Sequence, residues 1–406
     1  MQTNLAAFIK DTPQGREADA ILRACVHCGF CNATCPTYQL LGDELDGPRG
    51  RIYLIKQMLE GVAPSEKTQL HLDRCLTCRA CETTCPSGVR YGRLADIGRD
   101  LMEQRVERGF AERAKHALLR GVLPNPRLFN LLLRLGQLLR PLLPEKIRRK
   151  IPAAARQSAR PVAQHARKML LLEGCVQPAL APNINAATAR VLDKLGISML
   201  SAQGCCGAIT YHLNAQQAAL GQMRRNIDAW WPAVESGAQA LVISASGCGA
   251  LVKEYGHLLR DDPAYAQKAR RVSALAKDVS EIIAENKDNI AARMKKPVVD
   301  SRLAFHAPCT LQHALQLNGV VEELLTGLGF ALTGVPDAHL CCGSAGTYSI
   351  LQPALAQQLL KNKISALESG RPEKILTANI GCLNHLQSAT ALPVRHWIEI
   401  LDQHLS

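Results

Sequence analysis

Eight of the sixteen cysteines form two copies of one spacing pattern. The first copy precedes Pro36 and consists of Cys25, Cys28, Cys31 and Cys35. The second copy precedes Pro86 and consists of Cys75, Cys78, Cys81 and Cys85. Both read C-x2-C-x2-C-x3-C-P, a run that holds [4Fe–4S] clusters in pairs, with the fourth cysteine of each run serving the other cluster. The expected ligands are therefore Cys25, Cys28, Cys31 and Cys85 for cluster 1, and Cys75, Cys78, Cys81 and Cys35 for cluster 2.

Disulfide bonds and a zinc site are the two other common uses of such cysteines. Disulfide frameworks belong to oxidising compartments and short secreted chains, whereas residues 1–20 have no apolar signal-peptide core and carry several charged side chains. Two C-x2-C pairs could bind zinc through four thiolates. Zinc does not explain why both runs have four cysteines, the same spacing and a following proline. Two [4Fe–4S] clusters in a reducing compartment explain the pattern best.

The bulk composition indicates a globular protein of two or three domains. The chain has 406 residues, of which 47% are hydrophobic and 20% charged, and no apolar stretch reaches the ~18 residues of a membrane span. The net charge is +13, and most of the excess lies between Arg93 and Lys168, with 18 Lys and Arg against six Asp and Glu. Such a segment attracts anionic lipid, an acidic partner or nucleic acid. Nucleic acid is not expected, because aromatic residues are only 4% and offer no stacking platform.

Residues 96–167 read as a basic helical linker. Within it, residues 124–144 place leucines around more than one side of an expected helix, together with Arg127, Arg134 and Arg140. Such a helix could lie on a membrane surface. Packing against neighbouring elements is the usual fate of an apolar stripe. We therefore expect a helix buried between domains and then a flexible basic linker, with membrane contact as the alternative.

From residue 168 onwards the chain repeats itself at offsets of 134 to 136 residues. Each copy has an apolar strand ending near a cysteine, a Cys-Cys-Gly triplet, and a second apolar strand followed by Gly-Cys. The cysteines are Cys175, Cys205, Cys206 and Cys248 in the first copy and Cys309, Cys341, Cys342 and Cys382 in the second. Strands and helices alternate, which predicts parallel sheets covered by helices. The expected fold is multidomain α+β: a small, mainly helical two-cluster ferredoxin-like domain (15–95), then two duplicated α/β lobes (168–295 and 300–402).

The Cys-Cys-Gly triplets resemble the CCG domain, the cysteine-rich module of heterodisulfide reductase and its relatives. The resemblance implies a further iron–sulfur centre at the strand ends, where open α/β sheets place ligands. The fullest family pattern ends in C-x2-C, but Leu251 and His385 stand where that last cysteine would be. The eight repeat cysteines are thus candidates for a further redox or metal site. A modified cluster, a redox-active thiol pair, an acceptor site and buried structural cysteines remain open, and His306 and His339 are nearby histidines of the kind that usually form ordinary hydrogen bonds.

The residues favour a carrier of electrons over a catalyst. Removing a hydride from an organic substrate requires a flavin or nicotinamide, and no G-x-G-x-x-G follows a strand at the start of a βαβ unit. We therefore expect no catalytic residues in this chain, and FAD only on partner subunits. The alternative is a stand-alone enzyme similar to heterodisulfide reductase, with an active-site cluster in the CCG lobes.

The combination of two cysteine runs with two CCG lobes resembles the iron–sulfur subunits of glycolate oxidase, anaerobic glycerol-3-phosphate dehydrogenase and the lactate-utilisation complex. The glycolate oxidase family is the best match, through residues 23–31, 41–53, 245–249 and 339–348. The resemblance implies a subunit of a glycolate and D-lactate oxidase or dehydrogenase, with flavin-bearing partners and a quinone or other non-NAD acceptor. With thiols that need a reducing compartment and a basic, leucine-rich segment, we expect a cytoplasmic chain, peripheral on the cytoplasmic face of the inner membrane.

Overall fold

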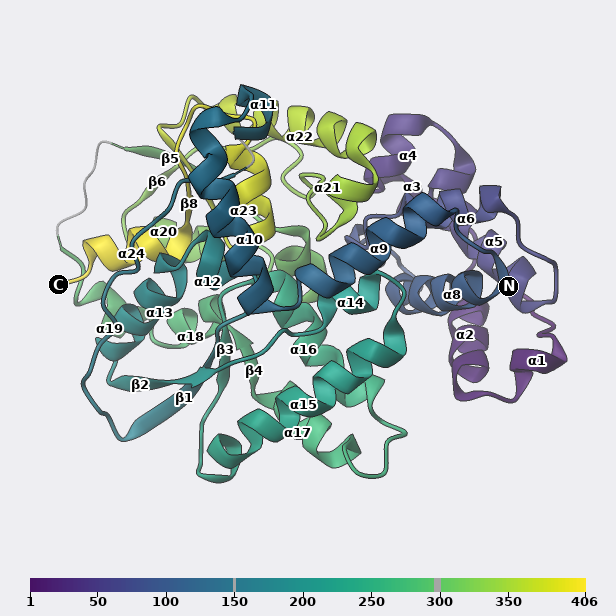
Figure 1. Cartoon of the computed structure of the whole chain (residues 1–406), viewed down its shortest axis with the longest axis horizontal. Helices are drawn as coiled ribbons and strands as arrows, with labels where there is room; N and C mark the ends of the chain where they lie inside the picture. Colours follow the sequence, from purple (N-terminus) through teal and green to yellow (C-terminus); the bar gives the residue numbers. More distant parts are fainter. Residues whose placement is uncertain (149–150, 296–300) are drawn as a thin grey trace.

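Short helices that begin and end around the cysteine runs build the N-terminal region. The structure is a computed structural model that describes residues 1–148, 151–295 and 301–406 (Figure 1). Residues 149–150 of the basic linker and residue 300, the expected start of the second lobe, lie outside the described residues. Residues 1–105 contain helices and no strand. The helices are α1 (Ala7–Lys10), α2 (Pro13–Ala24), α3 (Phe30–Ala33), α4 (Pro36–Leu41), η1 (Glu44–Asp46), α5 (Pro48–Leu59), α6 (Glu66–Asp73), α7 (Ala80–Thr83) and α8 (Tyr91–Arg105).

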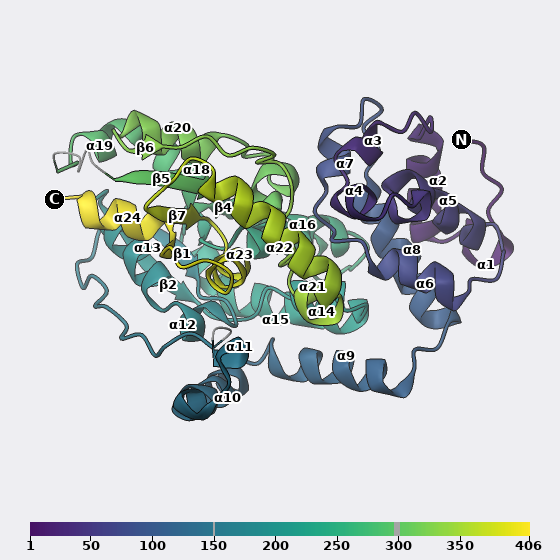
Figure 2. The same cartoon turned by 90° about the horizontal axis from the view of Figure 1, so that it is seen from above.

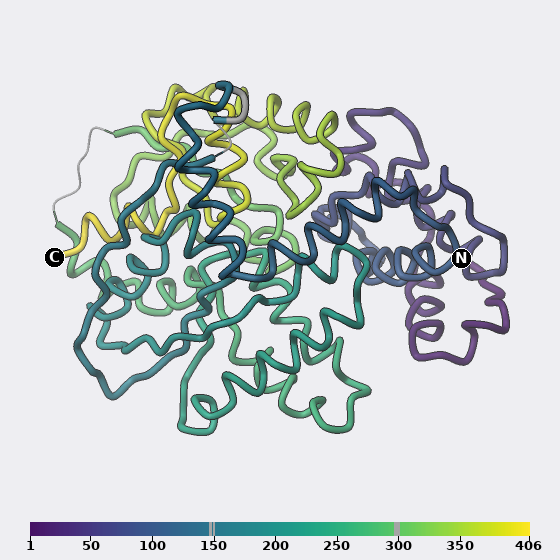
Figure 3. Tube along the Cα trace, in the orientation of Figure 1, coloured from purple at the N-terminus to yellow at the C-terminus, as the bar shows by residue number. Residues whose placement is uncertain are grey.

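A helical segment then runs over the outside of the molecule towards the lobes, along the lower edge in Figure 2 and across the front in Figure 3. It comprises α9 (Phe110–Val122), α10 (Pro126–Leu139), η2 (Arg140–Leu142) and α11 (Glu145–Arg148). None of the described helices is long and apolar enough to cross a membrane.

The expectation that the leucine-rich helix is buried between domains is wrong. No residue of α10 is buried, and Leu138 is 77% exposed. The physical reason is that the N-terminal region contacts the lobes directly, so α10 does not lie between them and packs only one side against α12 of lobe 1. One such direct contact is the ion pair between Arg79 of the second cysteine run and Glu254 of the first lobe (2.9 Å).

A second direct contact surrounds Glu17 of α2. Its carboxylate accepts hydrogen bonds from Arg93 (3.2 Å), His257 (2.8 Å) and Arg260 (3.1 Å), of which the last two belong to the first lobe. Burial raises the pKa of Glu17, but the hydrogen bonds from His257 and Arg93 outweigh it and hold that pKa well below its ordinary value. The carboxylate therefore ties the N-terminal region to the first lobe in its ionised form.

The two lobes have the same architecture, which confirms the predicted duplication and the parallel sheets. Lobe 1 contains β1 (Arg167–Leu172), α12 (Gln177–Leu180), α13 (Asn183–Asp193), β2 (Ile197–Ala202), α14 (Ala208–His212), α15 (Gln216–Glu235), β3 (Leu241–Ile243), α16 (Ser246–Leu258), α17 (Ala266–Leu275), β4 (Ala276–Asp278), α18 (Val279–Glu285) and α19 (Lys287–Ala291). Lobe 2 contains β5 (Arg302–His306), η3 (Thr310–Ala314), α20 (Val320–Gly327), β6 (Ala331–Leu332), α21 (Tyr348–Leu351), α22 (Pro353–Glu368), β7 (Lys374–Thr377), α23 (Ile380–Gln387), β8 (Val394–His396) and α24 (Trp397–His404). The strand orders are β2-β1-β3-β4 and β6-β5-β7-β8, with every pair parallel.

The lobes share one hydrophobic core and so form one body. Ile184 and Val242 of lobe 1 belong to the same buried cluster as Phe305 and Trp397 of lobe 2. A buried hydrogen bond links the lobes as well, between the His396 ring and the Ser244 carbonyl oxygen (2.8 Å). In both lobes the cysteines follow strand ends, so the shared body fixes the two cysteine groups relative to each other.

Candidate iron–sulfur sites

The two cysteine runs fold into two neighbouring pockets, and each pocket takes cysteines from both runs. Pocket 1 has about 420 Å³ and pocket 2 about 300 Å³ free of protein atoms, and both volumes include space open to solvent. The lining of pocket 1 includes Cys25, Cys28, Cys31 and Cys85. The lining of pocket 2 includes Cys75, Cys78, Cys81 and Cys35. The pockets are adjacent, because Cys81 and Tyr91 line both. The structure thus brings together the two sets of cysteines that the spacing predicted.

The two runs adopt the same backbone turns. His27 and Thr77 precede the second cysteine of each run with φ of 57° and 52°, and Gly29 and Arg79 follow it with φ of 89° and 61°. Side chains rarely adopt this left-handed region, so three non-glycine residues there indicate a conformation that the fold enforces. The short helices α3 and α7 begin directly after Gly29 and Arg79. These turns let three sulfurs of one short loop reach the same pocket.

The residues of both pockets fit [4Fe–4S] clusters. All sixteen cysteines are described, and all are free thiols. Each pocket has the four cysteine sulfurs that such a cluster requires, with Cys81 standing at the boundary between the two pockets. The remaining lining of pocket 1 includes the apolar side chains of Val26, Phe30, Ile52 and Val89.

Pocket 2 is buried beside positive charge. The Arg51 side chain is 1% exposed, and its Nη1 lies 4.0 Å from Cys35 Sγ. Two donors also approach Cys75 Sγ: the Tyr91 hydroxyl at 3.5 Å and the Thr77 backbone N–H at 3.4 Å. Burial raises the pKa of the Cys75 thiol, but the charges of Arg51 and Arg99 outweigh it and lower that pKa overall. Negative charge on the Cys75 sulfur is therefore stabilised, whereas burial raises the pKa of the Cys78 and Cys81 thiols of the same pocket.

Pocket 1 faces the surface instead. Cys28 is exposed, and its neighbours Val26 and Phe30 are 67% and 64% exposed. The nearby cation is Arg49, whose side chain is 36% exposed and paired with Glu44 (2.6 Å). Solvent screens such a charge more strongly than a buried one. The two pockets thus differ in access and in electrostatic environment.

The cysteine group of lobe 2 adjoins pocket 2. Cys309 and Cys341 lie with their sulfurs 3.8 Å apart, and both belong to one apolar cluster with Cys78 of pocket 2. The Tyr348 hydroxyl of lobe 2 donates to the Arg74 carbonyl oxygen, directly before Cys75 (3.1 Å). Lobe 2 therefore covers pocket 2, and leaves the exposed loop around Cys28 of pocket 1 uncovered.

The cysteines of lobe 1 also gather in one group. Cys205 interacts with Cys175 and Cys206, and Cys206 interacts with Cys248. Hydrogen bonds from Cys175 and Cys206 lower the pKa of Cys205 below its ordinary value. The group is anchored through its backbone by the Tyr255 hydroxyl, which donates to the Cys206 carbonyl oxygen (2.7 Å).

The glycine of each Cys-Cys-Gly triplet permits the turn that brings two adjacent thiols to one site. Gly207 and Gly343 have φ of 92° and 88°. At Gly343 an added Cβ would meet the Ala356 carbonyl oxygen at 2.6 Å, so a larger residue would push this turn away from α22.

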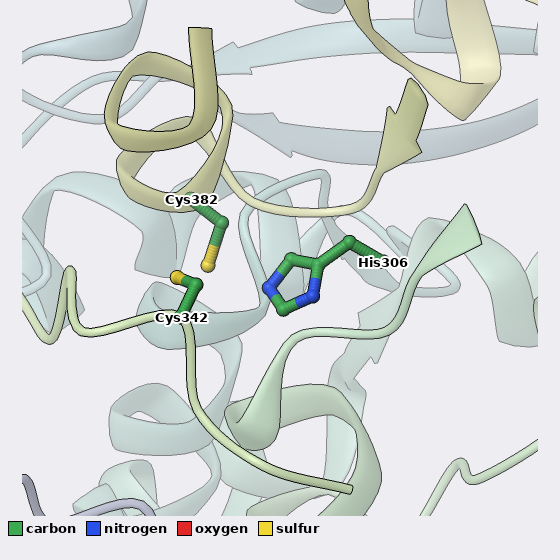
Figure 4. A group of neighbouring side chains, drawn as sticks. All are labelled: His306, Cys342 and Cys382. Carbon is green, nitrogen blue, oxygen red and sulfur yellow. The ribbon is translucent and has the colours of Figure 1, made fainter. Parts of the chain in front are cut away.

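His306 of lobe 2 lies closer to the cysteine sulfurs than the sequence indicated. His306 ends β5, and one of its ring nitrogens and the sulfurs of Cys342 and Cys382 all lie within 4.8 Å of one another (Figure 4). Burial lowers the pKa of His306 well below its ordinary value. The backbone oxygen of His339, by contrast, contacts the His313 ring (3.1 Å). The signal that could have found His306 is its position at a strand end, three residues before Cys309.

Comparison with protein families agrees with this layout. A 4Fe-4S dicluster domain matches residues 21–89, and a cysteine-rich CCG domain matches twice, over residues 169–253 and 303–387. The chain is therefore an iron–sulfur protein in which a dicluster domain precedes two CCG domains.

Relatives that match along most of the chain identify the family within this class of iron–sulfur proteins. The glycolate oxidase iron-sulfur subunit of Escherichia coli (strain K12) is 61% identical over 409 residues, covering 100% of this chain and 99% of the relative. The probable glycolate oxidase iron-sulfur subunit of Bacillus subtilis (strain 168) is 30% identical and covers 88% of this chain and 87% of the relative. Lactate utilization protein A of Bacillus licheniformis is 26% identical over 58% of this chain. The chain belongs to the family of glycolate oxidase iron–sulfur subunits, which confirms the resemblance.

Proposed function

We propose that this chain carries electrons within a complex that oxidises glycolate and also D-lactate, taking them from flavin-bearing partner subunits and delivering them to an acceptor such as a quinone. The observation that supports this function most is the pair of adjacent pockets, each with four cysteines drawn from both runs. When bound there, [4Fe–4S] clusters accept and donate single electrons, whereas the two-electron oxidation of the substrate belongs to the flavin.

The pocket linings support the ligand assignment made from the cysteine spacing. Cluster 1 is held by Cys25, Cys28, Cys31 and Cys85, and cluster 2 by Cys75, Cys78, Cys81 and Cys35. The exchanged fourth cysteines, Cys35 and Cys85, make the two sites one structural unit. Substituting either of them should therefore reduce the iron content of the pocket formed mainly by the other run.

The exposed loop of pocket 1 is the docking point for a flavin-bearing subunit. Electron transfer slows steeply with distance, so the entry point must allow a partner to come close. Cys28 is exposed, and Val26 and Phe30 offer apolar contact area beside it. Lobe 2 covers pocket 2 around Cys78, which supports entry at pocket 1.

The second part of the proposal is that the basic, leucine-rich helix α10 contacts a membrane surface. Four exposed leucines of this segment recur at helical spacing, and Arg127, Arg134 and Arg140 accompany them. These leucines are Leu131, Leu135, Leu138 and Leu142. An exposed apolar stripe with basic residues is typical of a helix that lies on an anionic lipid surface. This contact would place the chain, as a cytoplasmic protein, peripherally on the inner membrane, next to a quinone pool.

The stand-alone enzyme is the weaker candidate. An external disulfide substrate would have to reach the cysteines of the lobes, yet Cys205, Cys206, Cys341 and Cys342 are all buried.

The test is reconstitution with the partner subunits. Glycolate-dependent reduction of a quinone should require this chain, should be lost with Cys28→Ser, and should survive Cys248→Ser in lobe 1. Full-rate quinone reduction by the flavin subunits alone would contradict the proposal. The same assay with D-lactate tests the second substrate separately.

A further inference from the structure

His306 is a buried histidine whose polar atoms are left unpaired. Its side chain lies in the interior of lobe 2 with the ring directed at the sulfurs of Cys342 and Cys382 (Figure 4). The residue is 2% exposed, and neither ring nitrogen has a hydrogen-bond partner among the described residues. Leaving one buried polar group unpaired costs roughly 1–3 kcal/mol. An arrangement that leaves two nitrogens unpaired beside two thiols indicates a ligand that binds them.

Lobe 1 shows that the lobe architecture does not need a histidine at this place. The equivalent residue, three before the first cysteine of the lobe, is Leu172 at the end of β1, and it is buried in an apolar cluster. Cys206 and Cys248 correspond there to Cys342 and Cys382 of lobe 2. The same strand end therefore packs well with an apolar side chain, and packing alone does not account for His306.

We infer that His306, Cys342 and Cys382 form a binding site for a single divalent transition-metal ion, zinc(II) or iron(II), separate from the two four-cysteine pockets. Two thiolates and an imidazole are the donors that such ions prefer. A tetrahedral ion with bonds of about 2.3 Å to sulfur and 2.0–2.1 Å to nitrogen places these atoms roughly 3.5–3.8 Å apart. The three ligand atoms already lie within 4.8 Å of one another, so a small contraction completes the geometry.

The protein supplies three ligands to the ion, so the fourth position of a tetrahedral ion is left for water or another small ligand. Binding converts the Cys342 and Cys382 thiols to thiolates and releases their two protons to solvent. The ion would join the end of β5, the Cys-Cys-Gly turn and α23, which come from three separate stretches of the chain. Cys341 of the same turn packs in the same group of apolar side chains as Cys78, so the metal site lies next to pocket 2.

The experiment compares metal with acid-labile sulfide in the full chain, purified without oxygen. A [4Fe–4S] cluster contains iron and sulfide in equal numbers, so a single ion appears as metal in excess of sulfide. We expect an excess of one iron or zinc per chain, which elemental analysis identifies. The excess should disappear in His306→Ala and in Cys342→Ser, and should remain in Cys206→Ser, the matched variant of lobe 1. Unchanged sulfide in each variant shows that the N-terminal clusters and the fold are intact.

X-ray absorption at the edge of the excess metal gives a second readout on the unmodified chain. We expect sulfur ligands at ~2.3 Å and a nitrogen ligand at ~2.0–2.1 Å, and His306→Cys should keep the ion while replacing the nitrogen by sulfur. Equal metal and sulfide in the wild type would overturn the inference. Extra sulfide that depends on the lobe 2 cysteines, or an excess metal that His306→Ala leaves in place, would overturn it as well.

Discussion

Arg51 provides a quantitative test of the difference between the two pockets. Its guanidinium is buried beside Cys35, a proposed ligand of cluster 2. Reducing a cluster adds negative charge, so a nearby cation stabilises the reduced form and raises the reduction potential. At an effective dielectric constant of 20 and roughly 7 Å from the middle of a cluster, one charge contributes ~2 kcal/mol, which is ~100 mV for a one-electron couple.

Asp46 reduces the effect of Arg51 but does not cancel it. The Asp46 carboxylate lies 3.4 Å from Arg51, but it also pairs with Arg74 at 2.7 Å. We therefore expect Arg51→Met to lower the potential of one cluster by ~50–100 mV and Arg51→Lys, which keeps the charge, to lower it less. The assay is a redox titration of the full chain followed by electron paramagnetic resonance.

The matched control for this prediction is Arg49→Met. Arg49 stands beside pocket 1, but its side chain is partly exposed to solvent, unlike that of Arg51, and is paired with Glu44. Its removal should shift either potential by much less, because solvent screens its charge. Unchanged potentials in Arg51→Met, or an equal shift in Arg49→Met, would refute the argument that buried charge distinguishes the pockets.

Three further predictions concern surfaces and pH. Phe30→Glu should slow electron uptake from the flavin subunits at least tenfold while leaving iron content unchanged; equal stopped-flow rates would contradict docking at pocket 1. The double variant Leu135→Glu, Leu138→Glu should lose flotation with anionic vesicles, whereas Val62→Glu, at an exposed valine outside this helix, should retain it. Equal flotation of the two variants would contradict the proposed membrane contact. Glu17→Gln should lower the melting temperature at neutral pH; because the folded pKa is depressed, this difference should persist above pH 4.5 and shrink as the pH falls below that ordinary value. A difference that grows in acid would have the wrong sign.

The sequence predicted the parts of the structure whose chemistry is local or repeated. The cysteine spacing indicated which four sulfurs would meet. Three cysteines of a run follow one another in a short loop, and the fourth, which precedes a proline, lines the pocket of the other run. The offset of the repeats indicated that the two sheets would match, and their strand orders do. In both cases a pattern along the chain constrains geometry directly.

The exposed helix α10 and the position of His306 depend on neighbours that the sequence pattern does not reveal. The leucines of α10 indicate an apolar stripe, but not whether any other element has apolar surface to cover it. His306 meets Cys382 because β5 pairs with β7, which sets His306 beside Thr377, shortly before Cys382. That meeting depends on sheet order, so the histidine looked ordinary in the linear sequence.

The central claim is that this chain relays electrons through metal centres held in its N-terminal third. The most direct measurement adds glycolate without oxygen to the chain assembled with its flavin subunits and follows electron paramagnetic resonance. The account predicts signals of two reduced [4Fe–4S] clusters that disappear when a quinone is added. Clusters that stay oxidised while the quinone is reduced at full rate would contradict it.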